Sequence, residues 1–168
     1  MKRVLLILST TRYAKASLDG ALEEASRIAA GEGSAALHIL YIRETEELAR
    51  VKDSVDDRAF LGAGPQDNIL ESLEQQHHAT AMRRIDRARR GAEDLAGVAF
   101  SADEVQGDYT KLARKHAADY DVVYLCRADR PFVSRLLFGS ETDAVARLVR
   151  SEGGKVVVND ATPPAWQE

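Results

Sequence analysis

The sequence predicts an α/β protein with one doubly wound, five-stranded parallel sheet. Short apolar runs of strand length alternate along the chain with longer segments in which apolar residues recur at helical spacing. The 168 residues, of which 45% are hydrophobic, are enough for one well-buried core and too few for two ordinary domains. Because each crossover between parallel strands is right-handed and must cover a face of the sheet, we expect helices on both faces.

The first half of the chain predicts two strands and a helix, followed by a charged insertion. Residues Val4 to Ser9 form a continuous apolar run, which is typical of a strand covered on both faces. Apolar residues at helical spacing follow over about Ser17 to Ala30, and glycines stop the helix there. The run from Ala35 to Ile42 predicts a second strand. Residues 43–66 are charged and then rich in glycine and proline, which predicts a mobile insertion.

The second half continues the alternation and ends in a short tail. The domain is expected to span residues 1–160, with a C-terminal tail over 161–168 that contains two prolines. The expected elements are a helix over about 67–95, a strand over 98–105, a helix capped by Asp108, a strand over 122–126, a helix over about 141–150 and a strand over 155–159.

The composition argues against several classes of protein. The formal net charge is −4 and the sequence pI about 5.6, so there is no overall basic field to attract nucleic acid. A single cysteine cannot form an intramolecular disulfide, which indicates a reducing compartment. The apolar start of the chain is too short for a signal peptide, and the apolar runs are far below the roughly 20 residues that span a bilayer. We therefore expect a cytoplasmic protein without nucleic-acid or membrane partners.

Three segments are expected to converge at one edge of the sheet. Ligands of such sheets bind beyond the carboxyl ends of the strands, where the strand order reverses. This rule brings together residues 9–12, the pair Tyr41 and Ile42, and residues 126–140. The last of these segments follows a strand and opens a helix, which is where parallel α/β proteins usually hold anionic ligands.

These residues resemble the universal stress protein family over nearly the whole chain. A first strand that leads into a loop and an Ala-Leu-rich helix (VLLILSTTRY, then SLDGALEEASRIA) and a second strand (ALHILYI) are similar to the family. A Gly-Asp turn before a helix and an apolar strand (VQGDYTKLARKHAADYDVVYLC) also matches, and the most specific match is RLLFGSETDAVARLVRSEGGKVVVN. The resemblance implies the adenine nucleotide alpha-hydrolase-like fold, with strand order 3-2-1-4-5.

The resemblance also implies a nucleotide-binding loop, which is altered in this chain. ATP-binding members carry Gly, two residues, Gly, nine residues and Gly-Ser, with an aspartate after the first strand. Here the first glycine falls on Cys126 and the second on Asp129, the final Gly-Ser pair is kept, and the aspartate falls on a threonine. ATP binding in the family's usual mode is therefore not expected. The candidate nucleotide-binding residues of this altered site are Thr10, Thr11, Tyr41, Cys126, Arg127, Asp129, Arg130, Gly139, Ser140 and Glu141.

A second argument against phosphate binding needs no family. The run Ser140-Glu141-Thr142-Asp143 resembles a capping box at the start of a helix. Glu141 and Asp143 would already satisfy the positive end of the helix dipole. A phosphate arriving there would meet two carboxylates, so Gly139 and Ser140 are expected to start a helix rather than to cradle a ligand.

Other reactive side chains are expected to be structural. His38, His77 and His116 fall within apolar patterns and lack converging ligands, so no metal site is predicted. The arginines over 83–90 are interrupted by an aspartate and fit a solvated helix face. Cys126 stands beside an arginine that could depress the pKa of the thiol, but a buried thiol is the commoner case.

The sequence thus predicts a non-enzyme without a cofactor, since no catalytic constellation can be argued from spacing. The loop STTRY is not the Gly-rich loop of ATP pyrophosphatases and lacks the acidic pair of response regulators. We expect a stress-response or regulatory module that acts through protein partners and forms a homodimer through its last strand, Lys155 to Asn159. Two alternatives stay open: ATP binding through Gly139, Ser140 and the pair Arg127 and Arg130, or a redox module centred on Cys126.

Overall fold

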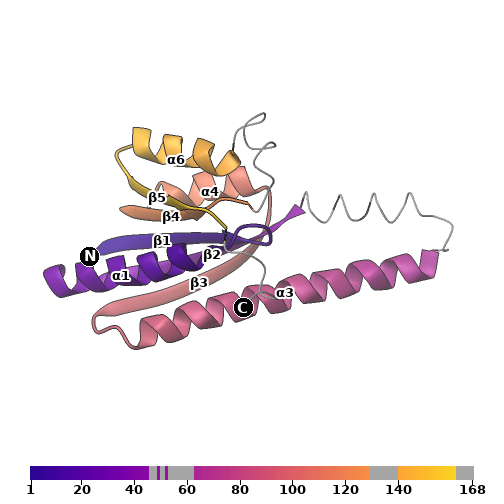
Figure 1. Ribbon diagram of the computed structural model, residues 1–168, viewed down its shortest axis with the longest axis horizontal. Helices are drawn as coiled ribbons and strands as arrows, with labels where there is room; N and C mark the ends of the chain where they lie inside the picture. The colour runs from indigo at the N-terminus through magenta and orange to yellow at the C-terminus, as the bar shows by residue number, and fades with distance from the viewer. Residues whose placement is uncertain (46–48, 50–51, 53–62, 129–139, 162–168) are drawn as a thin grey trace.

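The computed structural model describes residues 1–45, 49, 52, 63–128 and 140–161. These residues form a five-stranded, all-parallel sheet in the order β3-β2-β1-β4-β5, which confirms the predicted fold class and strand order. Figure 1 shows the sheet between two helical layers. The elements are β1 (Lys2–Ser9), α1 (Lys15–Glu32), β2 (Ala35–Glu44), α3 (Ala63–Glu93), β3 (Val98–Gly107), α4 (Tyr109–Ala117), β4 (Val122–Cys126), α6 (Glu141–Ser151) and β5 (Lys155–Asn159).

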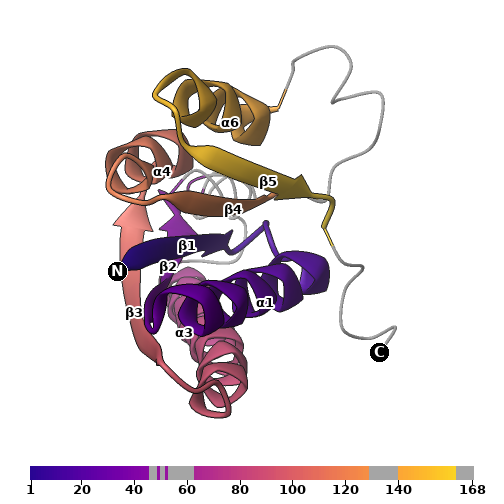
Figure 2. The same ribbon diagram turned by 90° about the vertical axis from the view of Figure 1, so that its left-hand side faces the viewer.

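The central strand β1 is buried on both faces, as its continuous apolar run predicts. Successive side chains of a strand point to opposite faces. Val4 and Leu6 therefore pack in the layer of α1 and α3, whereas Leu5 and Ile7 pack in the layer of α4 and α6, and all four are fully buried. Figure 2 shows α1 and α3 on one side of the strands and α4 and α6 on the other.

Local signals place three helix ends where the sequence predicts them. Gly33 ends α1 with a φ of 82°, a left-handed conformation that favours glycine, and its N–H donates to Ala29. Asp108 caps α4 by accepting from the N–H of Lys111 at 2.7 Å. Ser140 caps α6 by accepting from the N–H of Asp143 at 3.4 Å. The capping box inferred at residues 140–143 is thus confirmed at its serine.

The second strand continues further than the sequence predicts. Strand β2 runs on through Arg43 and Glu44, which the charge pattern assigns to the insertion, and Glu44 is buried. The helix expected from residue 67 begins at Ala63. Charge alone misleads at the end of β2 because Arg43 is paired with Glu104 and Glu44 with Arg12. The rest of the expected insertion, residues 46–48, 50–51 and 53–62, lies outside the described residues.

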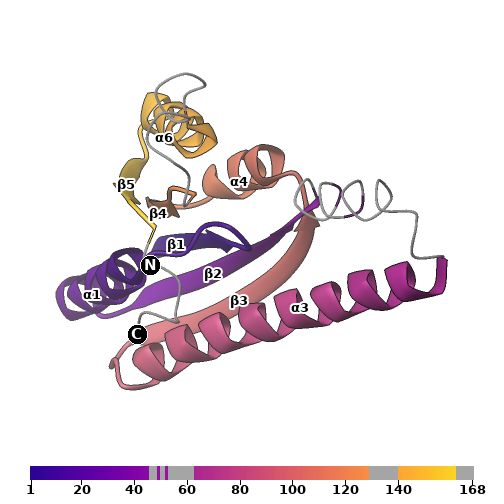
Figure 3. The ribbon, with the colours of Figure 1, turned by 45° about the vertical axis from the view of Figure 1, so that its right-hand side comes forward.

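Helix α3 is longer than the sheet that it covers. Its C-terminal half packs on the sheet through Ala81, Ile85, Ala88 and Ala92. Its N-terminal half continues past the carboxyl ends of β2 and β3 (Figure 3). Among the described residues, no helix is long and apolar enough to cross a membrane.

Candidate functional site

A tight turn after β1 shapes the edge of the sheet where ligands would bind. The N–H of Ser9 donates to the carbonyl of Arg12 at 2.9 Å, and the N–H of Arg12 donates back to Ser9 at 3.3 Å. This closed turn returns the chain toward the sheet, and the side chain of Arg12 is only 2% exposed. A fully buried guanidinium needs partners for its charge and its N–H groups.

Arg12 finds these partners on three other elements. Its Nη1 lies 2.6 Å from Oε2 of Glu44 at the end of β2, and its Nη2 donates to Oε2 of Glu141 in the first turn of α6. Its Cζ stands 3.9 Å from the centre of the ring of Tyr109, the first residue of α4. The Arg12 side chain therefore ties together the carboxyl edge of the sheet and both helices on one of its faces.

Two hydroxyl groups also donate hydrogen bonds to the carboxylate of Glu44. Ser9 Oγ and Thr11 Oγ1 both donate to Oε1 of Glu44, the latter at 2.7 Å. Burial by itself would raise the pKa of Glu44, but Arg12 and the two hydroxyl donors together hold it below its usual value. Glu44 is therefore a charged, hydrogen-bonded carboxylate at neutral pH.

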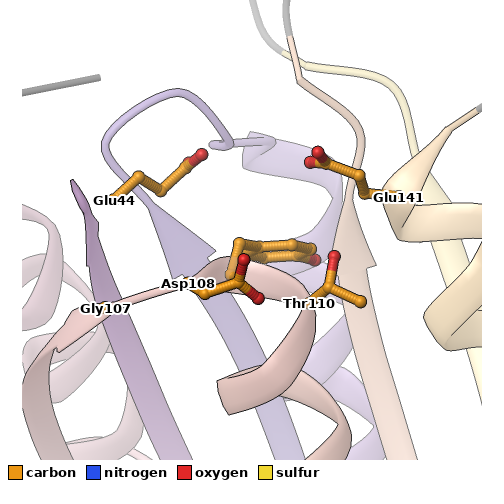
Figure 4. A pocket seen from close by; sticks show the side chains of 6 residues that line it. Glu44, Gly107, Asp108, Thr110 and Glu141 are labelled. Atoms are coloured by element: carbon orange, nitrogen blue, oxygen red, sulfur yellow. The ribbon is translucent and has the colours of Figure 1, made fainter. Parts of the chain in front are cut away.

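The space left beside Arg12 is very small. A pocket of about 10 Å³ is lined by Glu44, Gly107, Asp108, Tyr109, Thr110 and Glu141. This volume suffices for about one water molecule, whereas ligand pockets usually measure several hundred Å³. Figure 4 shows the carboxylates of Glu44 and Glu141 on opposite sides of this pocket, with Asp108 below them. The crevice is thus filled by side chains and bordered by negative charge.

Thr10 and Thr11, which the sequence predicts as ligand contacts, form hydrogen bonds within the protein at this edge. The N–H of Thr10 donates to the carbonyl of Ile42 at 3.2 Å, and its Oγ1 accepts from the N–H of Glu44 at 3.3 Å. Thr11 donates to Glu44 and accepts from Arg12 at 3.2 Å. Both residues join the ends of β1 and β2.

Tyr41 and Cys126 lie on the other face of the sheet. Both are fully buried in the layer of α1 and α3, away from Glu141. Burial raises the pKa of the Cys126 thiol to about 11, so the thiol is protonated at neutral pH. Its backbone carbonyl accepts from Thr142 Oγ1 at 3.1 Å, which ties β4 to α6.

Arg127 points to carboxylates rather than into the crevice. Its Nη2 lies 2.9 Å from Asp143 and its Nη1 lies 3.2 Å from Asp160. The hydrogen bonds that Arg127 donates to Asp143 are the main reason why the pKa of Arg127 is raised. Two carboxylates therefore neutralise the positive charge of Arg127. The alternative in which the chain binds ATP needs that charge for the nucleotide. Asp129, Arg130 and Gly139 lie outside the described residues, while Ser140 and Glu141 begin α6.

Of the histidines that the sequence leaves as structural, His38 has a hydrogen-bond partner, whereas Nδ1 of His77 is buried without one among the described residues. His38 Nδ1 lies 2.8 Å from Ser101 Oγ, and burial lowers the pKa of His38. His78 Nδ1 lies 2.8 Å from Glu104 on β3. In the part of the chain that the structure describes, no group of three or more histidine, cysteine or acidic residues could hold a metal ion.

Sequence reasoning placed Arg12 at the crevice without a role and missed Glu44 and Tyr109. A signal for Glu44 exists in the strand period, because Leu40, Ile42 and Glu44 alternate onto one face of β2. Extending the strand pattern by two residues would have placed a buried carboxylate opposite the loop after β1.

Comparison with solved structures identifies the fold. The structure of hypothetical protein MJ0577 has a TM-score of 0.63 at 14% identity, over 97% of this chain and 98% of that one. Universal stress protein UspA from Lactobacillus plantarum has a TM-score of 0.59 at 14% identity, over 94% and 96%. A universal stress protein in complex with cAMP has a TM-score of 0.56 at 15% identity, over 96% and 98%. No protein-family model and no curated protein matches the sequence.

Proposed function

We propose that this chain, which has the fold of universal stress proteins, is a non-catalytic stress-response or regulatory module of the cytoplasm. In this proposal it acts through contacts with protein partners and does not hold ATP in the usual mode of the family. The fold supports the general class, and the side chains at the carboxyl edge of the sheet support the specific statement about ATP.

The observation that carries the proposal is the position of Arg12. Its guanidinium occupies the crevice between Glu44 and Glu141 and over Tyr109, and the space that remains is about 10 Å³. A nucleotide could enter only if Arg12 left its partners. That movement would leave the carboxylate of Glu44 buried without its cation, which costs several kcal/mol.

Charge at the start of α6 opposes a triphosphate as well. Glu141 and Asp143 occupy the first turn of this helix, where a phosphate would otherwise profit from the helix dipole. Asp143 is already paired with Arg127, whose charge is shared with Asp160. The arrangement therefore offers an anion little net positive potential.

Calorimetry with ATP and magnesium tests this proposal. We expect a dissociation constant no tighter than the millimolar range, which corresponds to about −4 kcal/mol. The same weak result is expected for cAMP, the ligand of one protein of this fold. Micromolar affinity for either nucleotide would overturn the proposal and favour the alternative in which the chain binds nucleotide.

A double variant, Cys126→Gly with Asp129→Gly, is the matched comparison. It returns glycine to both altered positions of the loop and removes one carboxylate, so it should bind ATP more tightly than the unmodified chain. Arg12 still occupies the crevice in this variant. Adding Arg12→Ala together with Glu44→Gln, so that no unpaired carboxylate is left at Glu44, should therefore give a further gain, and equal affinities with and without these two changes would contradict the role given to Arg12.

A further inference from the structure

The open face of strand β3 carries a serine and a carboxylate beside a histidine. Strand β3 is one edge of the sheet, and its residues alternate so that Ser101 and Asp103 share one exposed face. His38 is the register partner of Ser101 on β2 and lies on the same side of the sheet as Leu40. A hydroxyl, an imidazole and a carboxylate therefore meet on the side of the sheet that α4 covers in part.

The contacts between these side chains follow the order of a nucleophile, a base and an orienting acid. His38 Nδ1 lies 2.8 Å from Ser101 Oγ, and His38 Nε2 lies 3.5 Å from Oδ2 of Asp103. The carboxylate favours the tautomer that carries its hydrogen on Nε2, so Nδ1 accepts from the hydroxyl of Ser101. Serine hydrolases activate their nucleophile by the same sequence of contacts, with the two ring nitrogens exchanged.

The surroundings of His38 fix its ring and keep it neutral. Tyr120, in the connection before β4, stacks on the imidazole with 5.8 Å between the ring centres and 21° between the planes. Burial lowers the pKa of His38 below its usual value, Asp103 opposes this effect, and His116 on α4 adds to it. His38 is therefore neutral at pH 7 and can take up the proton of Ser101, whose side chain faces solvent.

We propose that Ser101 is a modification site that accepts an acyl group from a small, neutral, activated ester, with His38 as the general base. Ser101 Oγ forms a bond to the acyl carbon, and the bond from that carbon to the leaving oxygen breaks. The proton of the hydroxyl passes to Nδ1 of His38 and from there to the leaving oxygen. The products are an acyl-serine ester and the free alcohol. Asp103 is a positioning residue, because it acts through His38.

Charge and location define the kind of donor. Asp103 is an exposed carboxylate beside the nucleophile, so it repels an anionic donor and leaves a neutral ester unaffected. His38 lies in the middle of β2, whereas the crevice that Arg12 fills lies beyond Glu44 at the end of this strand. The modification site is therefore separate from that crevice. Each chain takes up one acyl group, which is compatible with a module that is not an enzyme.

Acetylation with p-nitrophenyl acetate tests this site. The unmodified chain is treated with the ester at mildly alkaline pH and digested, and acetylated peptides are identified by mass spectrometry. We expect Ser101 to react at least about tenfold faster than Ser72, an exposed serine of α3. Hydroxylamine should then remove the acetyl group from Ser101 and leave acetylated lysines unchanged, because it cleaves esters and not amides. Equal acetylation of both serines would overturn the proposal.

Variants separate the base from its surroundings. His38→Gln can still accept from Ser101 but cannot take up its proton, so acetylation of Ser101 should slow at least about tenfold. Asp103→Asn should slow it by a smaller factor. Asp94→Asn, which changes an exposed carboxylate in the turn before β3, should leave the rate unaltered. An unchanged rate in His38→Gln would reject the role of this histidine.

The pH profile of the unmodified chain tests the base without any substitution, so a variant that folds poorly does not prevent the test. The rate at Ser101 should rise as His38 loses its proton and then level off, with a midpoint below the usual 6.5 of histidine. The groups that face His38 are Asp103, which raises its pKa, His116, which lowers it, and Tyr120, which is uncharged in this range. Asp103→Asn should therefore move the midpoint to lower pH. A rate that continues to rise above neutral pH without levelling off would reject His38 as the base.

Discussion

The ring of Tyr109 supports the guanidinium of Arg12, with 3.9 Å between the guanidinium carbon and the ring centre. Arg12 stands in the turn after β1 and Tyr109 opens α4, and the carboxylates that pair with Arg12 come from β2 and α6. One buried side chain thus joins four elements at the carboxyl edge of the sheet. A group placed in this way should matter for stability as well as for closing the crevice.

We predict that Arg12→Met lowers the free energy of unfolding by about 3 kcal/mol. The variant leaves Glu44 buried without its cation, and breaking one side of a buried ion pair typically costs about 3 to 5 kcal/mol. Urea unfolding at pH 7, followed by circular dichroism, measures the change. The matched control is Arg89→Met, which removes an exposed partner of Asp86 on α3 and should cost less than about 1 kcal/mol.

The double variant Arg12→Met with Glu44→Gln separates charge from packing. Glutamine removes the unpaired charge and can still accept from Ser9 and Thr11, so part of the lost stability should return. A double variant that is less stable than Arg12→Met alone would contradict the view that the unpaired carboxylate dominates the loss.

Glu24 on α1 should make the fold sensitive to acid. Its pKa is lowered to about 2, first because Arg27 donates to it and then because Lys155 on β5 does, against the effect of burial. A carboxylate whose pKa is lower in the folded chain stabilises the fold above its unfolded value, here 4.5, and loses this contribution as the pH falls toward 2.

The variant Glu24→Gln should therefore be less stable than the unmodified chain at pH 7 and about equal to it near pH 2. Arg27 and Lys155 are largely exposed, so solvent screening reduces the expected difference at pH 7 to about 1 kcal/mol. Thermal unfolding at a series of pH values measures it, with Glu23→Gln, at an exposed position of the same helix, as control. A constant difference between pH 7 and pH 2 would reject the assignment.

Two glycines of α1 should respond oppositely to alanine. A Cβ at Gly20 would stand 2.8 Å from Cε1 of Tyr124, which is itself buried on β4. The overpacking costs about 1 to 3 kcal/mol, more than the helix propensity of alanine returns, so Gly20→Ala should destabilise by about 1 kcal/mol. At Gly31 a Cβ meets no atom within 4 Å. Gly31→Ala should stabilise by about 0.5 kcal/mol, and urea unfolding that gives both variants the same sign would contradict this reasoning.

The sequence alone predicted the parts of the structure that depend on neighbouring residues. The bounds of β4 and β5 and the caps at Asp108 and Ser140 follow from strand and helix signals within a few residues. The strand order came from a family resemblance, because local patterns do not say which strands pair.

The partners of Arg12 could not be predicted in this way. Arg12 and Glu141 are 129 positions apart, and only the folded sheet brings them together. The same holds for Arg84, whose Nη1 donates to the carbonyl of Ser9, 75 positions earlier in the chain. A sequence shows which residues carry charge but does not show which charges compensate one another.

Cys126 should react slowly with thiol reagents in the folded chain. Its side chain is fully buried and burial raises the pKa to about 11, so thiolate is scarce at pH 8. Labelling with a chromogenic disulfide at pH 8 should be complete within minutes in 8 M urea, a general denaturing condition, and at least about a hundredfold slower without denaturant. Equally fast labelling in both conditions would revive the hypothesis of a redox module.

The last strand should join two copies of the chain. Strand β5 is an edge of the sheet, with partly exposed valines, and an apolar edge of this kind tends to pair with another strand. The N–H of Lys155 donates to the carbonyl of Asp121 in the connection before β4. Because N–H groups alternate along a strand, the N–H of Val157 points toward β4 and that of Val158 points away from it.

Val158→Pro should therefore remove an outward N–H and give a folded monomer, whereas Val157→Pro breaks the ladder to β4 and should destabilise the fold itself. Light scattering and circular dichroism on the unmodified chain and both variants test the interface. An unmodified chain that is monomeric, or a Val158→Pro variant that remains a dimer, would refute pairing through β5.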